Sequence, residues 1–149
     1  GTAANISIGI FTTSYYILNV TFFSTTIPIL IFAAVPERPE DLEVKEVTKN
    51  TVTLTWNPPK YDGGSEIINY VLESRLIGTE KFHKVTNDNL LSRKYTVKGL
   101  KEGDTYEYRV SAVNIIRQGK PSFCTRPITC KDELGMCLLQ FILLKLAHL

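Results

Sequence analysis

One run of residues constrains the fold more than any other: the alternating segment YEYRVSA at 106–112. Successive side chains of a strand point to opposite faces, so this run predicts a half-buried strand with one solvated face. The turn before it, KEGD at 101–104, contains a glycine that tolerates positive φ and an aspartate that can bond its own backbone. Leu100, this turn and Tyr106 together predict a tyrosine corner, in which the phenol hydrogen-bonds the backbone upstream and fixes the crossover between two sheets.

Other short runs, separated by turn signals, agree with this strand. The clearest is TVTLTW at 51–56, where Val52, Leu54 and Trp56 alternate with three threonines. Prolines end this strand, since proline cannot donate to a ladder. The remaining strands are expected near 42–47, 68–72, 81–85, 95–97 and 121–129. Seven short strands without a helical period between them are typical of an all-β sandwich.

The inward sides of these strands predict the core. Trp56 is the only tryptophan, and we expect it to fill the centre of the core rather than to serve as a ligand platform. Ile68, Tyr70 and Leu72 form the next inward set. The core residues on which the prediction depends most are Trp56, Tyr70, Leu100, Tyr106 and Val110.

The distribution of charge divides the chain into three segments. Residues 1–35 contain no Asp, Glu, Lys, Arg or His, residues 36–134 carry nearly all the charge, and residues 135–149 are apolar again. The abrupt change at PERP, residues 36–39, indicates a linker that enters a domain. We therefore expect an apolar extension, one domain and an apolar tail. The net charge of +2 is too small to indicate a nucleic-acid partner.

Two interpretations of the extension stay open. It is long enough to cross a bilayer, which needs about 20 apolar residues, and the sequons at Asn5 and Asn19 agree with an anchor over residues 6–35. Its many Thr and Ser residues, Pro28 and the lack of a basic N-terminal flank favour instead a non-native or mistranslated extension. The Leu-rich tail, 135–149, predicts a helix too short to span a bilayer.

The sequence contains no recognisable catalytic set. His83 and His148 are far apart, and no His pair or CxxC offers metal-ligand spacing. Three cysteines clustered at 124, 130 and 137 predict free thiols in a reducing compartment rather than a disulfide framework. We therefore expect neither an enzyme nor a bound cofactor.

Residues 36–134 resemble a fibronectin type III domain. The string WNPPKYDGGS at 56–65, the later Y-x-x-E at 70–73 and YEYRVSAVN at 106–114 carry the resemblance. Within that family they are most similar to modules of giant sarcomeric proteins of the titin type. The resemblance implies a seven-stranded, immunoglobulin-like sandwich that is one module in an array of fibronectin III and immunoglobulin modules.

The same resemblance implies neighbouring modules as partners, myosin thick-filament proteins as further partners, and a cytoplasmic location in the sarcomeric A-band. The alternative is a membrane-anchored cell-surface protein, with residues 6–35 as the anchor and the sandwich outside the cell. The two apolar ends, 1–35 and 135–149, match neither family of modules.

The loop after the alternating strand departs from the family pattern. Arg117 stands where such modules usually have a glycine, and forcing it to positive φ would cost about 1 kcal/mol, so we expect a reshaped loop. The integrin-binding Arg-Gly-Asp tripeptide is missing there. Ile115, Ile116 and Arg117 at the tip are candidates for a protein contact, and the alternative is that they pack on the neighbouring module.

Overall fold

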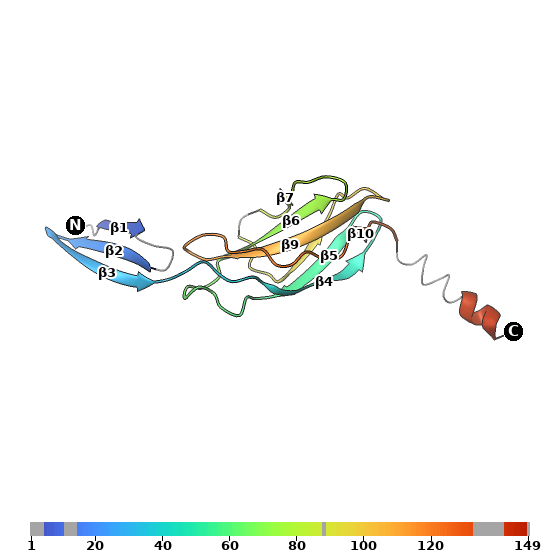
Figure 1. The fold of residues 1–149 in the computed structure, drawn as a ribbon, viewed down its shortest axis with the longest axis horizontal. Helices are drawn as coiled ribbons and strands as arrows, with labels where there is room; N and C mark the ends of the chain where they lie inside the picture. The colour runs from blue at the N-terminus through green and yellow to red at the C-terminus, as the bar shows by residue number, and fades with distance from the viewer. Residues whose placement is uncertain (1–4, 11–14, 88, 133–141, 149) are drawn as a thin grey trace.

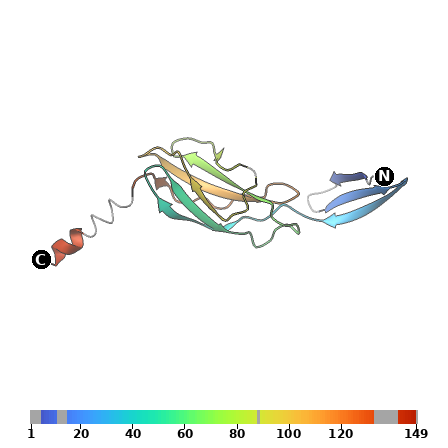
Figure 2. The same cartoon turned by 180° about the vertical axis from the view of Figure 1, so that it is seen from behind.

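The computed structural model describes residues 5–10, 15–87, 89–132 and 142–148. Within these residues β-structure dominates, and a small N-terminal sheet, a central sandwich and a helical stretch follow one another along the long axis (Figure 1). The view from behind shows the same arrangement (Figure 2). The sandwich confirms the predicted all-β, immunoglobulin-like fold class.

Two antiparallel sheets form the sandwich, one in the order β4-β5-β8 and the other in the order β10-β9-β6-β7. The strands are β4 (Glu40–Val47), β5 (Val52–Asn57), β6 (Asn69–Leu76), β7 (His83–Lys84), β8 (Lys94–Val97), β9 (Thr105–Val113) and β10 (Ile128–Thr129). The alternating segment is thus the greater part of β9. Because β9 pairs with β6 on one side and β10 on the other, it lies inside its sheet.

The core lies between the two sheets. Leu54 and Trp56 of β5 join Leu72 of β6 and Val110 of β9 in one cluster, and each is at most 3% exposed. Burying a large apolar side chain contributes about 1.5–3 kcal/mol, so these residues hold the sheets together. The Trp56 indole meets the Tyr70 ring edge-on, with ring centroids 5.6 Å apart and planes at 64°.

Leu100 and Tyr106 are half-buried and pack against this core. Tyr106 lies where β9 pairs with β10, and its hydroxyl donates to the Asp104 carboxylate at 3.4 Å. Burial raises the pKa of Tyr106, and a backbone hydrogen bond from Lys101 partly offsets that rise. The phenol therefore contacts the glycine turn upstream, as in a tyrosine corner, but its hydroxyl donates to the Asp104 side chain rather than to the backbone.

Ile68 does not face the core with Tyr70 and Leu72 as predicted, because its side chain is 46% exposed. β6 begins at Asn69, so Ile68 precedes the ladder, and its N–H donates to the Val113 carbonyl at the end of β9. Alternation applies only inside a strand, and Ile68 belongs to the loop at the end of the sheet.

The predicted closing strand, 121–129, is regular only over β10. Upstream of β10, the N–H groups of Ser122 and Thr125 donate to the carbonyls of Val110 and Tyr108, at 2.7 and 2.9 Å. Their hydroxyls accept from the N–H groups of those same two residues, at 3.0 and 3.1 Å. Side-chain hydroxyls thus replace backbone carbonyls along this edge of β9, so no regular ladder forms.

β4, an edge strand of the other sheet, is also irregular. Its register with β5 shifts twice, first between Glu40 and Glu43. Asp41 lies in that shift with φ +51°, and its carboxylate accepts a hydrogen bond from the Asn57 amide at 2.8 Å. Such bulges bend an edge and discourage its pairing with another chain.

The N-terminal extension contains a sheet that the sequence did not predict. Strands β1 (Asn5–Ile10), β2 (Tyr15–Phe22) and β3 (Thr25–Phe32) pair antiparallel in that order. The Thr, Ile and Tyr content that argued against a membrane helix is the composition that favours strands. No helix among the described residues is both long enough and apolar enough to cross a membrane.

Only part of the predicted tail helix can be compared with the structure. Residues 142–147 are helical. Residues 135–141 and 149, and with them Cys137, lie outside the described residues.

Candidate functional site

The linker and Ala34 just before it are held by a set of contacts at the end of the sandwich where the chain enters, which we call the N-terminal pole. We call this set of contacts the linker clasp. Its members are Ala34, Pro36, Gly63, Asn114 and Gly119. The Ala34 N–H donates to the Gly63 carbonyl at 2.7 Å, and the Asn114 amide donates to the Ala34 carbonyl at 2.6 Å. Both backbone groups of Ala34 are therefore bound to the sandwich.

Two glycines let the linker lie this close. Gly63 has φ +84°, and a Cβ there would overlap the Ala34 carbonyl oxygen. A Cβ at Gly119 would overlap the carbonyl oxygen of Pro36, which is itself fully buried. The linker thus runs between the 61–64 loop and the 114–119 loop, and a methyl group on either glycine would displace it.

Asn114 joins the linker to the loop that follows β9. It is 1% exposed. Its amide nitrogen donates also to the Asp62 carbonyl at 2.9 Å, while its side-chain oxygen accepts from the Ile116 N–H at 2.9 Å and the Arg117 N–H at 3.4 Å. This one side chain therefore connects three segments, and nearly all its hydrogen-bonding capacity is used.

The loop avoids the positive φ that a glycine would take at position 117. The described non-glycine residues with positive φ are Phe23, Asp41 and Asn89. The loop closes instead through the Asn114 hydrogen bonds and through the Gly119 N–H, which donates to the Ala112 carbonyl at 2.9 Å. Arg117 takes an ordinary conformation because Asn114, not a glycine, sets the turn.

The three tip residues lie together at this pole. Ile115 is 67% exposed, Ile116 is half-buried and Arg117 is exposed. The core residues Trp56, Tyr70 and Val110 lie away from them, between the sheets. The structure therefore brings the predicted contact residues next to the linker clasp and not next to the predicted core set.

A second set of hydrogen bonds fixes the chain where it leaves the sandwich. The Cys130 N–H donates to the Asp104 carbonyl, and the Gly103 N–H donates to the Cys130 carbonyl, both at 2.9 Å. The Lys49 N–H donates to the Asp132 carboxylate at 3.1 Å. Cys130 is fully buried, and burial raises the pKa of its thiol. We call this set the exit contacts.

The solvated face of the β6–β9 pair carries two ion pairs between residues that lie directly opposite one another on the two strands. Arg109 binds Glu73 at 2.9 Å, and Arg75 binds Glu107 at 2.6 Å. The Arg109 guanidinium lies over the Phe82 ring, 3.9 Å from its centroid. These half-buried groups satisfy one another, so they act as cross-strand pairs that support the sheet.

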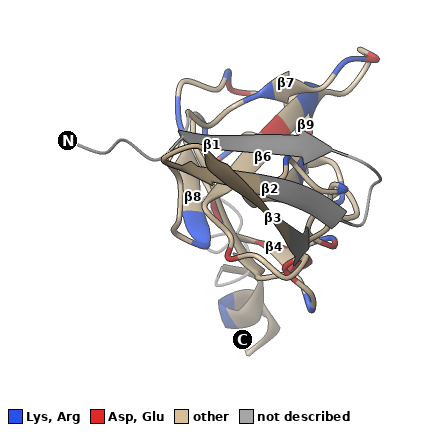
Figure 3. Cartoon of the chain, turned by 90° about the vertical axis from the view of Figure 1, so that its left-hand side faces the viewer, with Lys and Arg blue, Asp and Glu red and all other residues tan. Residues whose placement is uncertain are grey.

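Nothing in the described part of the chain assembles reactive groups. No cluster of three His, Cys, Asp or Glu residues that could hold a metal ion occurs there. Cys124 and Cys130 are free thiols, and burial raises the pKa of both, which lowers the fraction of reactive thiolate at neutral pH. Seen from the N-terminal end, Lys and Arg positions and Asp and Glu positions are interspersed along the described ribbon (Figure 3).

A family model described as "Fibronectin type III domain" matches residues 37–127, more than half of the chain. The chain belongs to the fibronectin type III family. Fast-type myosin-binding protein C of Mus musculus is 37% identical to it over 93 residues, 62% of this chain and 8% of that protein. Myomesin-2 of Homo sapiens is 32% identical over 108 residues, 72% of this chain and 7% of that protein. The chain thus spans less than a tenth of the length of these relatives.

Among solved structures, titin module A71 from human cardiac muscle matches this fibronectin III chain with a TM-score of 0.61 and 34% identity. The match covers 66% of this chain and 95% of that module. The sandwich therefore corresponds to one complete module. The resemblance to titin-type modules that the sequence indicated is confirmed.

The members of the linker clasp were visible in the sequence only as parts of the family string. Gly63, Asn114 and Gly119 occupy motif positions, but alternation says nothing about them because they lie outside the strands. The sequence did contain one signal for the clasp. Glycines in two separate loops and a proline in the linker are typical of places where one backbone segment lies close to another. Which segments approach one another depends on the tertiary fold.

Proposed function

We propose that this fibronectin III domain is a non-catalytic structural module of a sarcomeric protein, connected in line with neighbouring modules. The observation that carries the proposal is the position of the two connections. The chain enters the sandwich at one end of the long axis and leaves at the other (Figure 1). Both connections are bound to the sandwich, by the linker clasp and by the exit contacts.

This arrangement suits a module that transmits axial tension. Tension applied to the linker is borne first by the Ala34 hydrogen bonds and by the close packing of Pro36 against Gly119. Force then reaches the antiparallel ladders of both sheets, whose strands run between the two poles. Because the linker is held on two sides, the direction of whatever precedes it is fixed relative to the sandwich.

The partners follow from the same geometry. The exposed tip at Ile115, Ile116 and Arg117 lies beside the linker clasp, so a preceding immunoglobulin or fibronectin III module would meet it first. The similarity to myosin-binding protein C, myomesin-2 and titin supports association with myosin thick filaments and an A-band location. A remaining exposed face of the sandwich would make the filament contact.

Localisation and binding of the full chain test the proposal. The chain, tagged with a fluorescent protein, is expected to form A-band striations in cultured cardiomyocytes and to co-sediment with purified myosin filaments. A double Ile115→Ser, Ile116→Ser variant is expected to keep filament binding, because the filament contact is assigned to another face of the sandwich. Diffuse fluorescence together with no co-sedimentation would refute the sarcomeric assignment.

The same cells distinguish the alternative of a membrane-anchored cell-surface protein. The apolar composition of residues 6–35 and the sequons at Asn5 and Asn19 favour that alternative. Retention in carbonate-washed membranes, with a mobility shift that glycosidase removes, would establish it. Release by carbonate without a glycan shift is expected here.

A further inference from the structure

A groove follows the seam between the two sheets, where β4 and residues 120–128 form the edges. Its larger part has a volume of about 850 Å³ and lies between the start of β4 and residues 120–124. A second hollow of about 410 Å³ continues it toward Ile128, and Leu42 lines both. The two hollows together follow β4 and residues 120–128, a course that an extended peptide can match.

Phe123 lies at the groove with its ring 79% exposed. The Arg38 guanidinium lies over this ring, 4.8 Å from the centroid. A cation held against an aromatic face restrains both side chains, so the ring is positioned in advance. Covering it would remove apolar area from water, which favours association with an apolar side chain of a partner.

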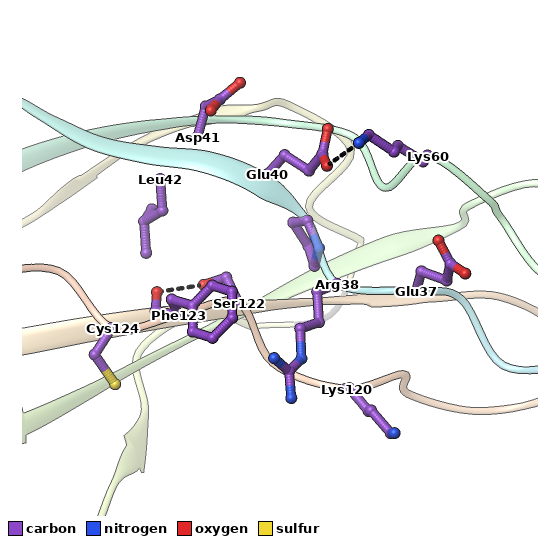
Figure 4. A pocket seen from close by; sticks show the side chains of 11 residues that line it. Glu37, Arg38, Glu40, Asp41, Leu42, Lys60, Lys120, Ser122, Phe123 and Cys124 are labelled. Atoms are coloured by element: carbon purple, nitrogen blue, oxygen red, sulfur yellow. Dashed lines mark hydrogen bonds and ion pairs between the residues drawn. The ribbon is translucent and has the colours of Figure 1, made fainter.

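Two cations beside this ring have no carboxylate partner in the described part of the chain. Arg38 and Lys120 extend to the same side of the groove, the side of the Phe123 ring (Figure 4). Among the described residues, no carboxylate lies within ion-pair distance of either one. Lys60, in contrast, is paired with Glu40 at 3.3 Å on the other side.

We propose that this groove binds an extended acidic segment of a partner protein. In the complex a large apolar side chain of the segment covers the Phe123 ring, and its carboxylates pair with Arg38 and Lys120. Arg38 and Lys120 give the sign of the segment, since Glu40 on the other side of the groove is already paired with Lys60 and Asp41 accepts from Asn57. The course of the groove along β4 and residues 120–128 suits an extended chain. This contact is separate from the joints at the two poles.

Two other modes of binding fit the groove less well. Addition of a strand to β4 is opposed by its register shifts and by the positive φ of Asp41. Docking on an anionic membrane is opposed because a flat array of lipid phosphates would meet Glu37, Glu40 and Asp41 along with the two cations, whereas a single segment can place its carboxylates on the side of Arg38 and Lys120. Side-chain docking of a peptide uses Arg38 and Lys120 and needs no ladder along β4.

The test titrates the full chain, labelled with ¹⁵N, with a capped octapeptide of alternating glutamate and leucine. Amide shifts are expected at residues 38–44 and 120–126, with affinity falling as salt rises because exposed ion pairs are screened. Phe123→Ala and the double variant Arg38→Gln, Lys120→Gln are each expected to weaken binding at least fivefold. All the altered side chains are exposed, so the variants are expected to melt with the parent.

Matched controls make the result decisive. Phe23→Ala removes a ring of similar exposure, 74%, from the turn between β2 and β3 and is expected to leave affinity unchanged. A lysine–leucine octapeptide is expected not to bind. The proposal fails if the acidic peptide does not shift the groove, if both peptides bind alike, or if the Phe123 variant binds as the parent does. Binding to phosphatidylserine vesicles in place of the peptide would also overturn it.

Discussion

The linker clasp makes a quantitative prediction that three glycine-to-alanine variants of the full chain can separate. Gly63 and Gly103 both have positive φ, +84° and +87°. A methyl group at Gly103 meets no atom within 4 Å, whereas at Gly63 it overlaps the Ala34 carbonyl oxygen. The strain of a left-handed alanine, about 1–2 kcal/mol, is therefore common to both variants. Of these two variants, Gly63→Ala alone also expels the linker.

The additional cost is set by the hydrogen bonds that the expelled linker loses. The bonds from Ala34 to Gly63 and from Asn114 to Ala34 each contribute about 0.5–1.5 kcal/mol net. Gly63→Ala is thus expected to destabilise the domain by about 2–5 kcal/mol and Gly103→Ala by about 1–2 kcal/mol. Gly119 does not have a left-handed φ, so Gly119→Ala adds only the steric overlap with Pro36. We expect this variant to lower the free energy of unfolding by about 1–3 kcal/mol.

Urea unfolding gives these free energies, and hydrogen exchange shows where they arise. The Ala34 amide is expected to exchange faster in Gly63→Ala and Gly119→Ala, and at the parent rate in Gly103→Ala. Equal destabilisation by the Gly63 and Gly103 variants, with the Ala34 amide protected in both, would refute the reasoning. The linker would then contribute nothing to the stability of the sandwich.

Three further predictions concern the core and the boundaries. Trp56→Ala is expected to cost about 3–5 kcal/mol, and a cooperative melt within a few degrees of the parent would contradict the central place of this indole. Burial raises the pKa of Tyr108 above its value in the unfolded chain, about 10, so the free energy of unfolding is constant below that pH and falls as the pH rises above it. Tyr108→Phe is expected to flatten this decline when unfolding is measured at a series of pH values. Because the Tyr108 hydroxyl has no partner among the described residues, the variant is expected to be as stable as the parent or more stable at neutral pH. Residues 36–134 alone are expected to melt cooperatively, and a non-cooperative melt would place essential contacts in the two ends.

The sequence was most informative where side chains alternate between solvent and core. β5 and β9 each bury one face in the interior, so a period of two was sufficient to predict Trp56 and Val110 as inward-facing. The same rule failed at Ile68, because no local signal marks the residue at which the ladder begins. It failed again at 121–127, because hydroxyls of Ser122 and Thr125 can substitute for carbonyls without changing the hydrophobic pattern.

The candidate sites were less predictable for a different reason. The linker clasp depends on backbone groups of Ala34 and Gly63 that meet only after the sandwich has folded. Asn114 looked like a motif residue, and its four hydrogen-bond partners come from three segments of the chain. The sequence indicated that the loop at Arg117 departs from the family pattern, but not that the Asn114 side chain sets that turn.

The irregular edges of the sandwich have a consequence for folding within the proposed tandem array of modules. Tandem modules of similar sequence keep one another at millimolar effective concentration, which promotes exchange of strands between neighbours during folding. A flat edge would accept a neighbour's strand. The register shifts in β4 and the hydroxyl-capped edge of β9 offer an incoming strand no continuous ladder to join. In the proposed array, each module would thereby close upon itself, and misfolded dimers of adjacent repeats would be avoided.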